Sequence, residues 1–287
     1  MSDHAPDTIR FEQPIVILSA PRSGSTLLFE TLARAKGVHT IGGESHRVIE
    51  GMPVLSTASR GYDSNRLEAA DAPDDVIGEL RARFGQALRD RGGRQPEAGE
   101  SVRFLEKTPK NILRIPFMRE VFPGVKFVVL FRDPRAVLSS MMEAWRSGHF
   151  VTYPRLPEWH GLPWSLLLVP GWQRMSGRPL EEVVAYQWAC ATYVMLKDLE
   201  DVPEADWLPI RYEDLVADPA RQVDGLCQWL DVEWDEPLHK LPLSRFTLSA
   251  PSEDKWRQNE AAILRVMPLV QQIQAQVDAL LARRASA

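Results

Sequence analysis

Residues 19–26, Ser-Ala-Pro-Arg-Ser-Gly-Ser-Thr, concentrate hydroxyl side chains, turn residues and one arginine in a short segment. The segment follows an apolar run at 14–18 that predicts a buried strand, and it precedes leucines at helical spacing in 25–35. Where a strand passes into a helix, successive backbone N–H groups and the helix N-terminus face an anion. We therefore expect these residues to bind a phosphate or sulfate group.

The segment departs from the loop that binds ATP. Against the pattern G-x-x-x-x-G-K-[ST], Gly24 and Thr26 match, but Ser19 replaces the first glycine and Ser25 replaces the lysine. The positive charge lies inside the loop instead, at Arg22. A tight turn without a ligand is the alternative, and the concentration of Ser, Thr and Arg donors argues against it.

A second strand–turn–helix unit lies near the middle of the chain. Residues 126–131 form an apolar run, Asp133 suits a helix N-cap and Pro134 suits the first helical position. Residues 102–106 and 207–211 are two shorter strand candidates, each followed by a helical segment. Strands that alternate with helices predict an α/β fold with a parallel sheet.

Two motifs now indicate a family. Residues 21–28 resemble the 5′-phosphosulfate loop of the sulfotransferases that use 3′-phosphoadenosine 5′-phosphosulfate (PAPS), especially the protein-tyrosine and bacterial branches, which carry arginine where cytosolic members carry lysine. Residues 131–140 are similar to the family's 3′-phosphate site, in which an arginine at a strand end and a serine eight residues later bind the phosphate; here these are Arg132 and Ser140. Considered alone, Arg132 could equally be a phosphate ligand or a surface ion-pair residue. Likewise, Ser140 could equally be a phosphate ligand or a hydroxyl on a helix surface. Together and in this order, the motifs make the resemblance specific.

The resemblance implies a fold and a set of nucleotide contacts. The fold is a P-loop NTPase-like three-layer α/β fold, with a central parallel sheet flanked by helices. The implied loop contacts to PAPS are Arg22, Ser23, Gly24, Ser25 and Thr26. Tyr212 is similar to the family's tyrosine near the adenine, although in isolation its segment reads as a strand end and a helix cap. Ser249 and Lys255 resemble a loop that closes over the nucleotide; otherwise Lys255 reads as a solvated surface lysine.

Sulfuryl transfer moves an SO₃ group in line to an acceptor hydroxyl, so it needs a base and cations that stabilise the leaving phosphate. Residues 43–49 resemble the segment in which the protein-tyrosine branch places its catalytic glutamate, which implies Glu44 as the base. Cytosolic members use a histidine in a Lys-Thr-His motif, and here that motif reads Lys107-Thr108-Pro109. Lys107 remains as a cation toward the transferring group. His46 is the alternative base, because residues 44 and 46 of an extended segment point the same way.

No metal is expected. The six histidines show no metal-ligand spacing with one another or with a cysteine pair. A transferring sulfuryl also carries less negative charge than a phosphoryl, so Arg22, Lys107 and the helix N-terminus can suffice.

Composition excludes some classes of protein. The chain has 287 residues with 34 Lys plus Arg against 39 Asp plus Glu, a net charge of −5 that excludes a generally basic nucleic-acid coat. No apolar run approaches the ~20 residues that span a bilayer, and the first residues lack the basic start and apolar core of a signal peptide. We therefore expect a cytoplasmic protein whose Cys190 and Cys227 are reduced core residues.

We expect one sulfotransferase domain over 1–287, with an insertion at 50–100 and a lid-like segment at 145–179. The lid segment holds four of the nine tryptophans, Trp145, Trp159, Trp164 and Trp172. With the insertion, it is the natural place for an acceptor that carries a hydroxyl on a small-molecule or lipid-like body. The alternative is that these tryptophans pack the lid on the core or form a homodimer contact.

Two other functions stay open on the sequence. A P-loop kinase or other ATP-dependent phosphotransferase predicts magnesium dependence and stabilisation by 5′-ADP. A sulfotransferase predicts stabilisation by the product 3′,5′-ADP (PAP) without metal. A non-catalytic nucleotide-binding protein is the third reading, since fold does not settle function.

Overall fold

The protein is described by a computed structural model that covers residues 9–238, 241 and 253–285. Its main sheet has the strand order β4-β3-β5-β2-β6-β9, with β1 paired to β5 as well. The strands are β1 (Arg10–Phe11), β2 (Ile15–Leu18), β3 (Val38–Thr40), β4 (Arg89–Asp90), β5 (Ser101–Glu106), β6 (Lys126–Phe131) and β9 (Trp207–Arg211). All pairs are parallel except β3–β4. The predicted parallel α/β sheet is therefore confirmed.

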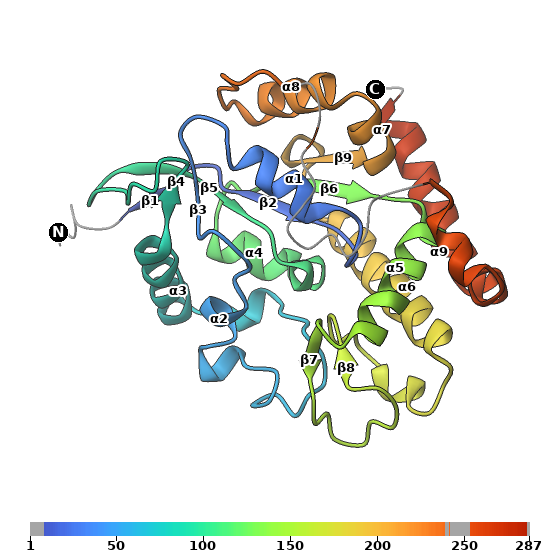
Figure 1. The fold of residues 1–287 in the computed structure, drawn as a ribbon. Coiled ribbons are helices and arrows are strands. Elements are labelled where there is room, and N and C mark those ends of the chain that lie inside the picture. Colours follow the sequence, from blue (N-terminus) through green and yellow to red (C-terminus); the bar gives the residue numbers. More distant parts are fainter. Residues whose placement is uncertain (1–8, 239–240, 242–252, 286–287) are drawn as a thin grey trace.

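Helices cover both faces of this sheet (Figure 1). One face carries α1 (Ser25–Leu32), α7 (Tyr212–Ala217) and α8 (Pro219–Leu230). The other carries α3 (Asp74–Ala87), α4 (Ile115–Val121), α5 (Pro134–Ser147), α6 (Leu180–Leu199) and α9 (Glu260–Ala285). The short helix α2 (His46–Ile49) leads from the main sheet into the insertion. The predicted three-layer arrangement is present.

The layers follow from the two-residue repeat of a strand. In β2, Ile15 and Ile17 pack into the core on the α1 side, whereas Val16 and Leu18 pack into the core on the α4 and α5 side. All four side chains are buried because helices cover both faces. This is why the central strand reads as a continuous apolar run.

Local signals set where the helices begin. The carboxylate of Asp133 accepts a hydrogen bond of 2.8 Å from the backbone N–H of Arg135, and Pro134 opens α5, as predicted. Helix α1 begins directly after Gly24 and ends at Leu32, three residues before the end expected from the leucine spacing. The loop between β2 and α1 is therefore held between a buried strand and a short buried helix.

The lid-like segment contains a two-stranded antiparallel sheet, β7 (Val151–Tyr153) and β8 (Trp164–Ser165), apart from the main sheet (Figure 1). Its four tryptophans pack against one another with ring centroids 4.8 to 6.3 Å apart. Trp145, Trp164 and Trp172 are buried, and Trp159 is partly exposed. The aromatic residues thus form an internal cluster of the lid, which agrees with the packing alternative.

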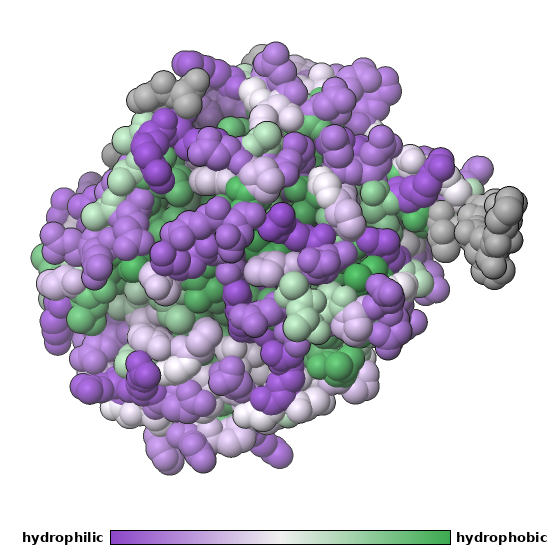
Figure 2. Space-filling model, turned by 180° about the vertical axis from the view of Figure 1, so that it is seen from behind, coloured by the Kyte–Doolittle hydropathy of each residue, from purple (hydrophilic) through white to green (hydrophobic). Residues whose placement is uncertain are grey.

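Polar side chains cover most of the surface seen from behind, with apolar residues in the gaps between them (Figure 2). Among the described residues, no helix combines the length and apolarity needed to cross a bilayer.

Cys190 and Cys227 are free thiols, partly buried and buried respectively, and burial raises the pKa of each to about 11.

Candidate active site

The predicted site residues meet at one edge of the main sheet. Residues 19–24 follow β2, Lys107 follows β5, Arg132 follows β6 and Tyr212 follows β9. These strands are mutually parallel neighbours, so their carboxyl ends lie at the same edge. In open α/β sheets, ligands bind outside these carboxyl ends.

The loop after β2 has the backbone shape of an anion-binding turn. Arg22 has φ 70° and Gly24 has φ 96° before α1 begins, and such left-handed residues are typical of turns whose backbone N–H groups bind anions. A Cβ on Gly24 would lie 2.5 Å from the ring of Tyr212. Glycine at position 24 is thus required both by its φ and by the close approach of the aromatic ring.

The two predicted phosphate motifs are in direct contact. Arg22 Nε donates to Ser140 Oγ at 3.3 Å, across 118 residues of sequence. Arg132 Nη1 donates to the carbonyl of Arg22 at 3.2 Å, and its guanidinium carbon lies 4.3 Å from the centroid of the Tyr212 ring. The structure therefore brings Arg22, Arg132, Ser140 and Tyr212 together as expected.

Positive charge is crowded at this edge. Burial lowers the pKa of Arg22, and the charge of Arg132 lowers it further, while Glu44 raises it. Burial also lowers the pKa of Lys255, and Arg132 and Arg22 add to this effect. The three cations therefore repel one another across a shared space, and a bound anion would relieve that repulsion. Ser249, predicted beside Lys255, lies outside the described residues.

The predicted base is held by two partners. Glu44 Oε1 accepts from Lys107 Nζ at 2.5 Å, and Glu44 Oε2 is 2.7 Å from His46 Nε2. Burial favours the neutral acid, but the contacts to His46 and Lys107 outweigh it and lower the pKa of Glu44 to about 2. Lys107 Nζ also donates to Thr26 Oγ1 at 3.1 Å, which joins the base to the phosphate loop.

Sequence reasoning missed some residues of this region. The guanidinium carbon of Arg22 lies 4.7 Å from the centroid of the Phe150 ring, so the lid reaches the loop through an aromatic side chain. Glu106, next to Lys107, is fully buried at the end of β5. The signal that could have identified Glu106 is a carboxylate that directly follows the apolar pair Phe104 and Leu105 at the end of a strand.

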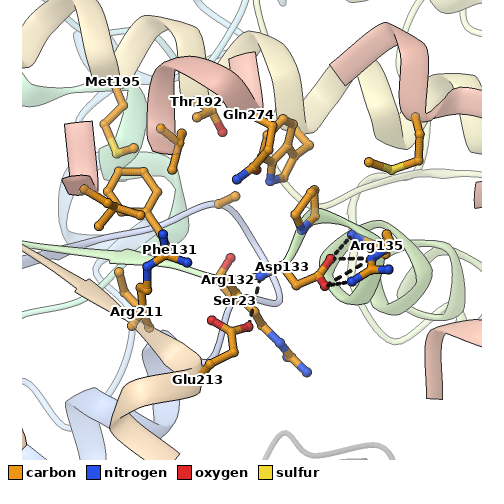
Figure 3. A pocket seen from close by; sticks show the side chains of 17 residues that line it. Ser23, Phe131, Arg132, Asp133, Arg135, Thr192, Met195, Arg211, Glu213 and Gln274 are labelled. Carbon is orange, nitrogen blue, oxygen red and sulfur yellow. Dashed lines mark hydrogen bonds and ion pairs between the residues drawn. The ribbon is translucent and has the colours of Figure 1, made fainter. Parts of the chain in front are cut away.

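A cavity of about 370 Å³ adjoins the phosphate loop on the α6 and α9 side of the sheet (Figure 3). Ala20, Ser23 and Arg132 line it on the loop side, while Thr192 and Gln274 line it from α6 and α9. Two acidic residues at its edge have partners within the protein. Asp133 accepts from the side chain of Arg135 and donates its backbone N–H to Glu213 Oε1 at 3.0 Å.

Within the described residues, no group of three or more His, Cys, Asp or Glu side chains is arranged to hold a metal ion.

Comparisons with a family model, with curated proteins and with solved structures all find sulfotransferases. A sequence model of a family described as "Sulfotransferase family" matches residues 14–236. Protein-tyrosine sulfotransferase A of Caenorhabditis elegans is 26% identical over 227 residues, which cover 77% of this chain and 50% of that protein. Protein-tyrosine sulfotransferase 2 of Gallus gallus is 24% identical over 243 residues, 83% of this chain and 57% of that protein. The chain thus spans about half the length of the curated relatives that it matches.

Among solved structures, a sulfotransferase from Alicyclobacillus acidocaldarius aligns with 91% of this chain and 96% of its own, at 15% identity and a TM-score of 0.49.

Proposed function

The chain belongs to the sulfotransferase family, and we propose that it transfers a sulfuryl group from PAPS to a hydroxyl group of an acceptor, with PAP as the by-product. One observation carries this proposal. The pair Glu44–Lys107 is joined through Thr26 to the same loop whose Arg22 contacts Ser140 of the second phosphate motif. A base, a cation and two anion-binding segments therefore share one edge of the sheet.

The residues present fit a ligand with two anionic ends. The loop N–H groups and Arg22 would bind the 5′-phosphosulfate, while Arg132, Ser140 and Lys255 would bind the 3′-phosphate. Tyr212, packed against both Gly24 and Arg132, would lie beside the adenine. The mutual repulsion of Arg22, Arg132 and Lys255 is the feature that supports an anion at this place.

Sulfuryl transfer requires one proton acceptor and one cation that stabilises the leaving group. The acceptor oxygen forms a bond to sulfur while the bond from sulfur to the bridging oxygen of PAPS breaks, and the hydroxyl proton goes to Glu44. Lys107 is 3% exposed and sits between Glu44 and Thr26, so a small movement of Nζ toward the leaving oxygen would release Glu44 Oε1 for that proton. Arg22 would stabilise charge on the transferring group.

A kinase function has less support from the same contacts. In ATP-type loops the hydroxyl at the position of Thr26 binds Mg²⁺ and the preceding lysine binds phosphate. Here Lys107 Nζ lies 3.1 Å from that hydroxyl, and serine precedes it.

For the acceptor, we propose a hydroxyl on a small-molecule or lipid-like body, with the insertion 50–100 and the lid segment 145–179 as the elements that bind it. The support is Phe150, a partly exposed aromatic side chain of the lid that lies against Arg22. The names of the relatives make the tyrosine phenol the competing acceptor. A single domain over 1–287, a homodimer and a cytoplasmic location stay predictions.

The test is transfer of labelled sulfate from PAPS to a panel of phenols, aliphatic alcohols, long-chain alcohols and a tyrosine peptide, with PAPS hydrolysis as a readout that needs no acceptor. We expect Glu44→Gln to lower turnover by roughly 10²- to 10⁴-fold at saturating PAPS, while PAP binding measured by calorimetry stays within about twofold. His46→Asn is the matched variant and should keep most of the activity. Wild-type turnover by Glu44→Gln would refute the assignment of the base.

A further inference from the structure

Four fully buried polar side chains form a hydrogen-bond network that adjoins the Glu44–Lys107 pair. They are Ser45, Glu106, Thr108 and Asn111, each 0% exposed. Ser45 Oγ donates to Glu106 Oε1 at 2.6 Å, and the backbone N–H of Ser45 donates to Thr108 Oγ1 at 2.7 Å. Asn111 Nδ2 donates to the same Glu106 oxygen at 3.0 Å.

The network joins two segments that are distant in sequence. Ser45 lies between Glu44 and His46, whereas Glu106 and Thr108 lie on either side of Lys107. The bonds from Ser45 to Glu106 and Thr108 cross 61 and 63 residues of sequence. They therefore fix the backbone that carries Glu44 against the backbone that carries Lys107.

Glu106 is suited to this task as a neutral acid. Burial raises its pKa, and the hydrogen bonds from Ser45 and Asn111, together with the charge of Lys107, offset only part of that effect. Among the described residues, Glu106 Oε2 and Asn111 Oδ1 have no hydrogen-bond partner. An uncharged carboxyl avoids the large cost of a buried charge, and it still offers Oε1 to two donors.

We propose that Glu106 and Ser45 are positioning residues, which hold the backbone that carries Glu44 beside the backbone that carries Lys107 and thereby keep the base and the cation aligned for transfer. Before transfer, this arrangement places Lys107 Nζ 2.5 Å from Glu44 Oε1. The proposed phosphate ligands Arg22, Arg132 and Ser140 lie outside this network, so we expect nucleotide binding to be independent of it. This inference rests on the proposed function, in which Glu44 is the base.

The experiment compares Glu106→Gln, Glu106→Leu and Ser45→Ala. Glutamine keeps an oxygen acceptor for Ser45 and Asn111, whereas leucine removes it at similar volume. Ser45→Ala removes one hydroxyl and leaves the backbone bond to Thr108, so it is the mild variant if Glu106→Leu does not fold. Thr31→Val is the matched control, because Thr31 is also 0% exposed and its hydroxyl donates to Leu27 in its own helix.

We expect Glu106→Leu and Ser45→Ala to lower kcat by roughly 10- to 100-fold, since a misplacement of about 1 Å costs up to about 10²-fold. The PAP dissociation constant should stay within about twofold, and Glu106→Gln and Thr31→Val should keep near wild-type kcat. The proposal is wrong if Ser45→Ala keeps wild-type kcat, if PAP binding weakens in proportion to kcat, or if Glu106→Gln loses as much kcat as Glu106→Leu.

The Glu44→Gln variant separates this inference from the proposed function. An active Glu44→Gln enzyme would overturn the function itself. An inactive Glu44→Gln beside fully active positioning variants would overturn the inference alone.

Discussion

Glu44 is the proposed base, and both of its carboxylate oxygens are engaged. Lys107 contacts one oxygen and His46 contacts the other, which keeps the pKa of Glu44 at about 2. A base with so low a pKa is ionised at any physiological pH, but it is also weak. In the proposed mechanism, proton transfer to Glu44 becomes easier when Lys107 turns toward the leaving phosphate, because the loss of that contact raises the proton affinity of the carboxylate.

The lowered pKa predicts a pH dependence of stability. A carboxylate whose pKa is lower in the folded chain stabilises the fold above the unfolded value of 4.5, and this contribution disappears as the pH falls toward 2. A shift of this size corresponds to on the order of 3 kcal/mol. Between pH 5 and pH 2, the free energy of unfolding of the wild type should therefore fall by about that much more than that of Glu44→Gln, as measured by urea denaturation at each pH. An equal decrease in the free energy of unfolding of the two proteins between pH 5 and pH 2 would contradict the contacts of Glu44.

At the level of residues, the short motifs could be predicted from the sequence, but the hydrogen bonds that hold their neighbouring segments in place could not. Gly24 belongs to a loop between a strand and a helix, a place where glycine is common because it allows a positive φ. Arg132 and Ser140 were predicted from the resemblance of their segment to a family motif. The bonds of Ser45 to Glu106 and Thr108 join positions more than sixty residues apart, and nothing local in the sequence encodes them.

At the level of elements, a second buried cluster joins the insertion to the lid. Glu50, just after α2, accepts from Lys110 Nζ at 2.7 and 2.8 Å and from Arg114 Nη2 at 2.6 Å. Lys110 Nζ is also 3.4 Å from the hydroxyl of Tyr153 in β7, which accepts a bond of 2.6 Å from Asn65. Burial lowers the pKa of Lys110 to about 8, although Glu50 opposes this effect. The elements proposed to bind the acceptor are therefore tied together by charge as well as by apolar packing.

Removing Glu50 should destabilise the protein strongly. The side chains of Lys110 and Arg114 are 4% and 1% exposed, so Glu50→Gln leaves two buried cations without their carboxylate. We expect a loss of about 3–5 kcal/mol in the free energy of unfolding, measured by chemical denaturation at pH 7. Glu79→Gln is the control, because Glu79 pairs with Arg83 on an exposed helix surface and should cost less than about 1 kcal/mol. Equal losses in the two variants would show that burial of the Glu50 cluster has no energetic effect.

Strands β2 and β6 and helix α5 could be predicted from sequence, whereas the long helices α6 and α9 and the shortest strands were not predicted. Strands β2 and β6 read as apolar runs because they lie between two helical layers, and α5 has both an N-cap and an opening proline. Strands β1 and β4 have two residues each, and pairing with neighbours rather than local preference forms them. The tryptophan content distinguished residues 145–179 from the rest of the chain but did not predict the packing of the indole rings, which depends on the tertiary fold.

At the level of the whole molecule, the net charge of −5 and an anionic ligand are compatible because the charge is unevenly placed. Arg22, Lys107, Arg132 and Lys255 converge at the carboxyl ends of neighbouring strands, together with the N-terminus of α1. The overall charge excluded a nucleic-acid coat, but it carried no information about a local anion site.

This placement predicts that the fold distinguishes nucleotides by their 3′-phosphate. At about 100 times its dissociation constant, PAP should raise the melting temperature by roughly 5 to 10 °C without added metal, and 5′-ADP should raise it by much less. Ser140→Ala should reduce the PAP shift toward the ADP value. Ser147→Ala, on the same helix with its hydroxyl bonded to Ala144, should leave it unchanged. A larger shift with 5′-ADP and magnesium would support the kinase function instead.

The indole cluster of the lid also has an optical consequence. Rings with centroids 4.8 to 6.3 Å apart are close enough for their electronic transitions to couple, which produces paired circular-dichroism bands of opposite sign. Excitation also passes between such rings before light is emitted, so the emission of the group depends on the surroundings of its partly exposed member, Trp159. The segment 145–179 therefore contains its own spectroscopic probe, and a change in its packing on ligand binding would be detectable without a label.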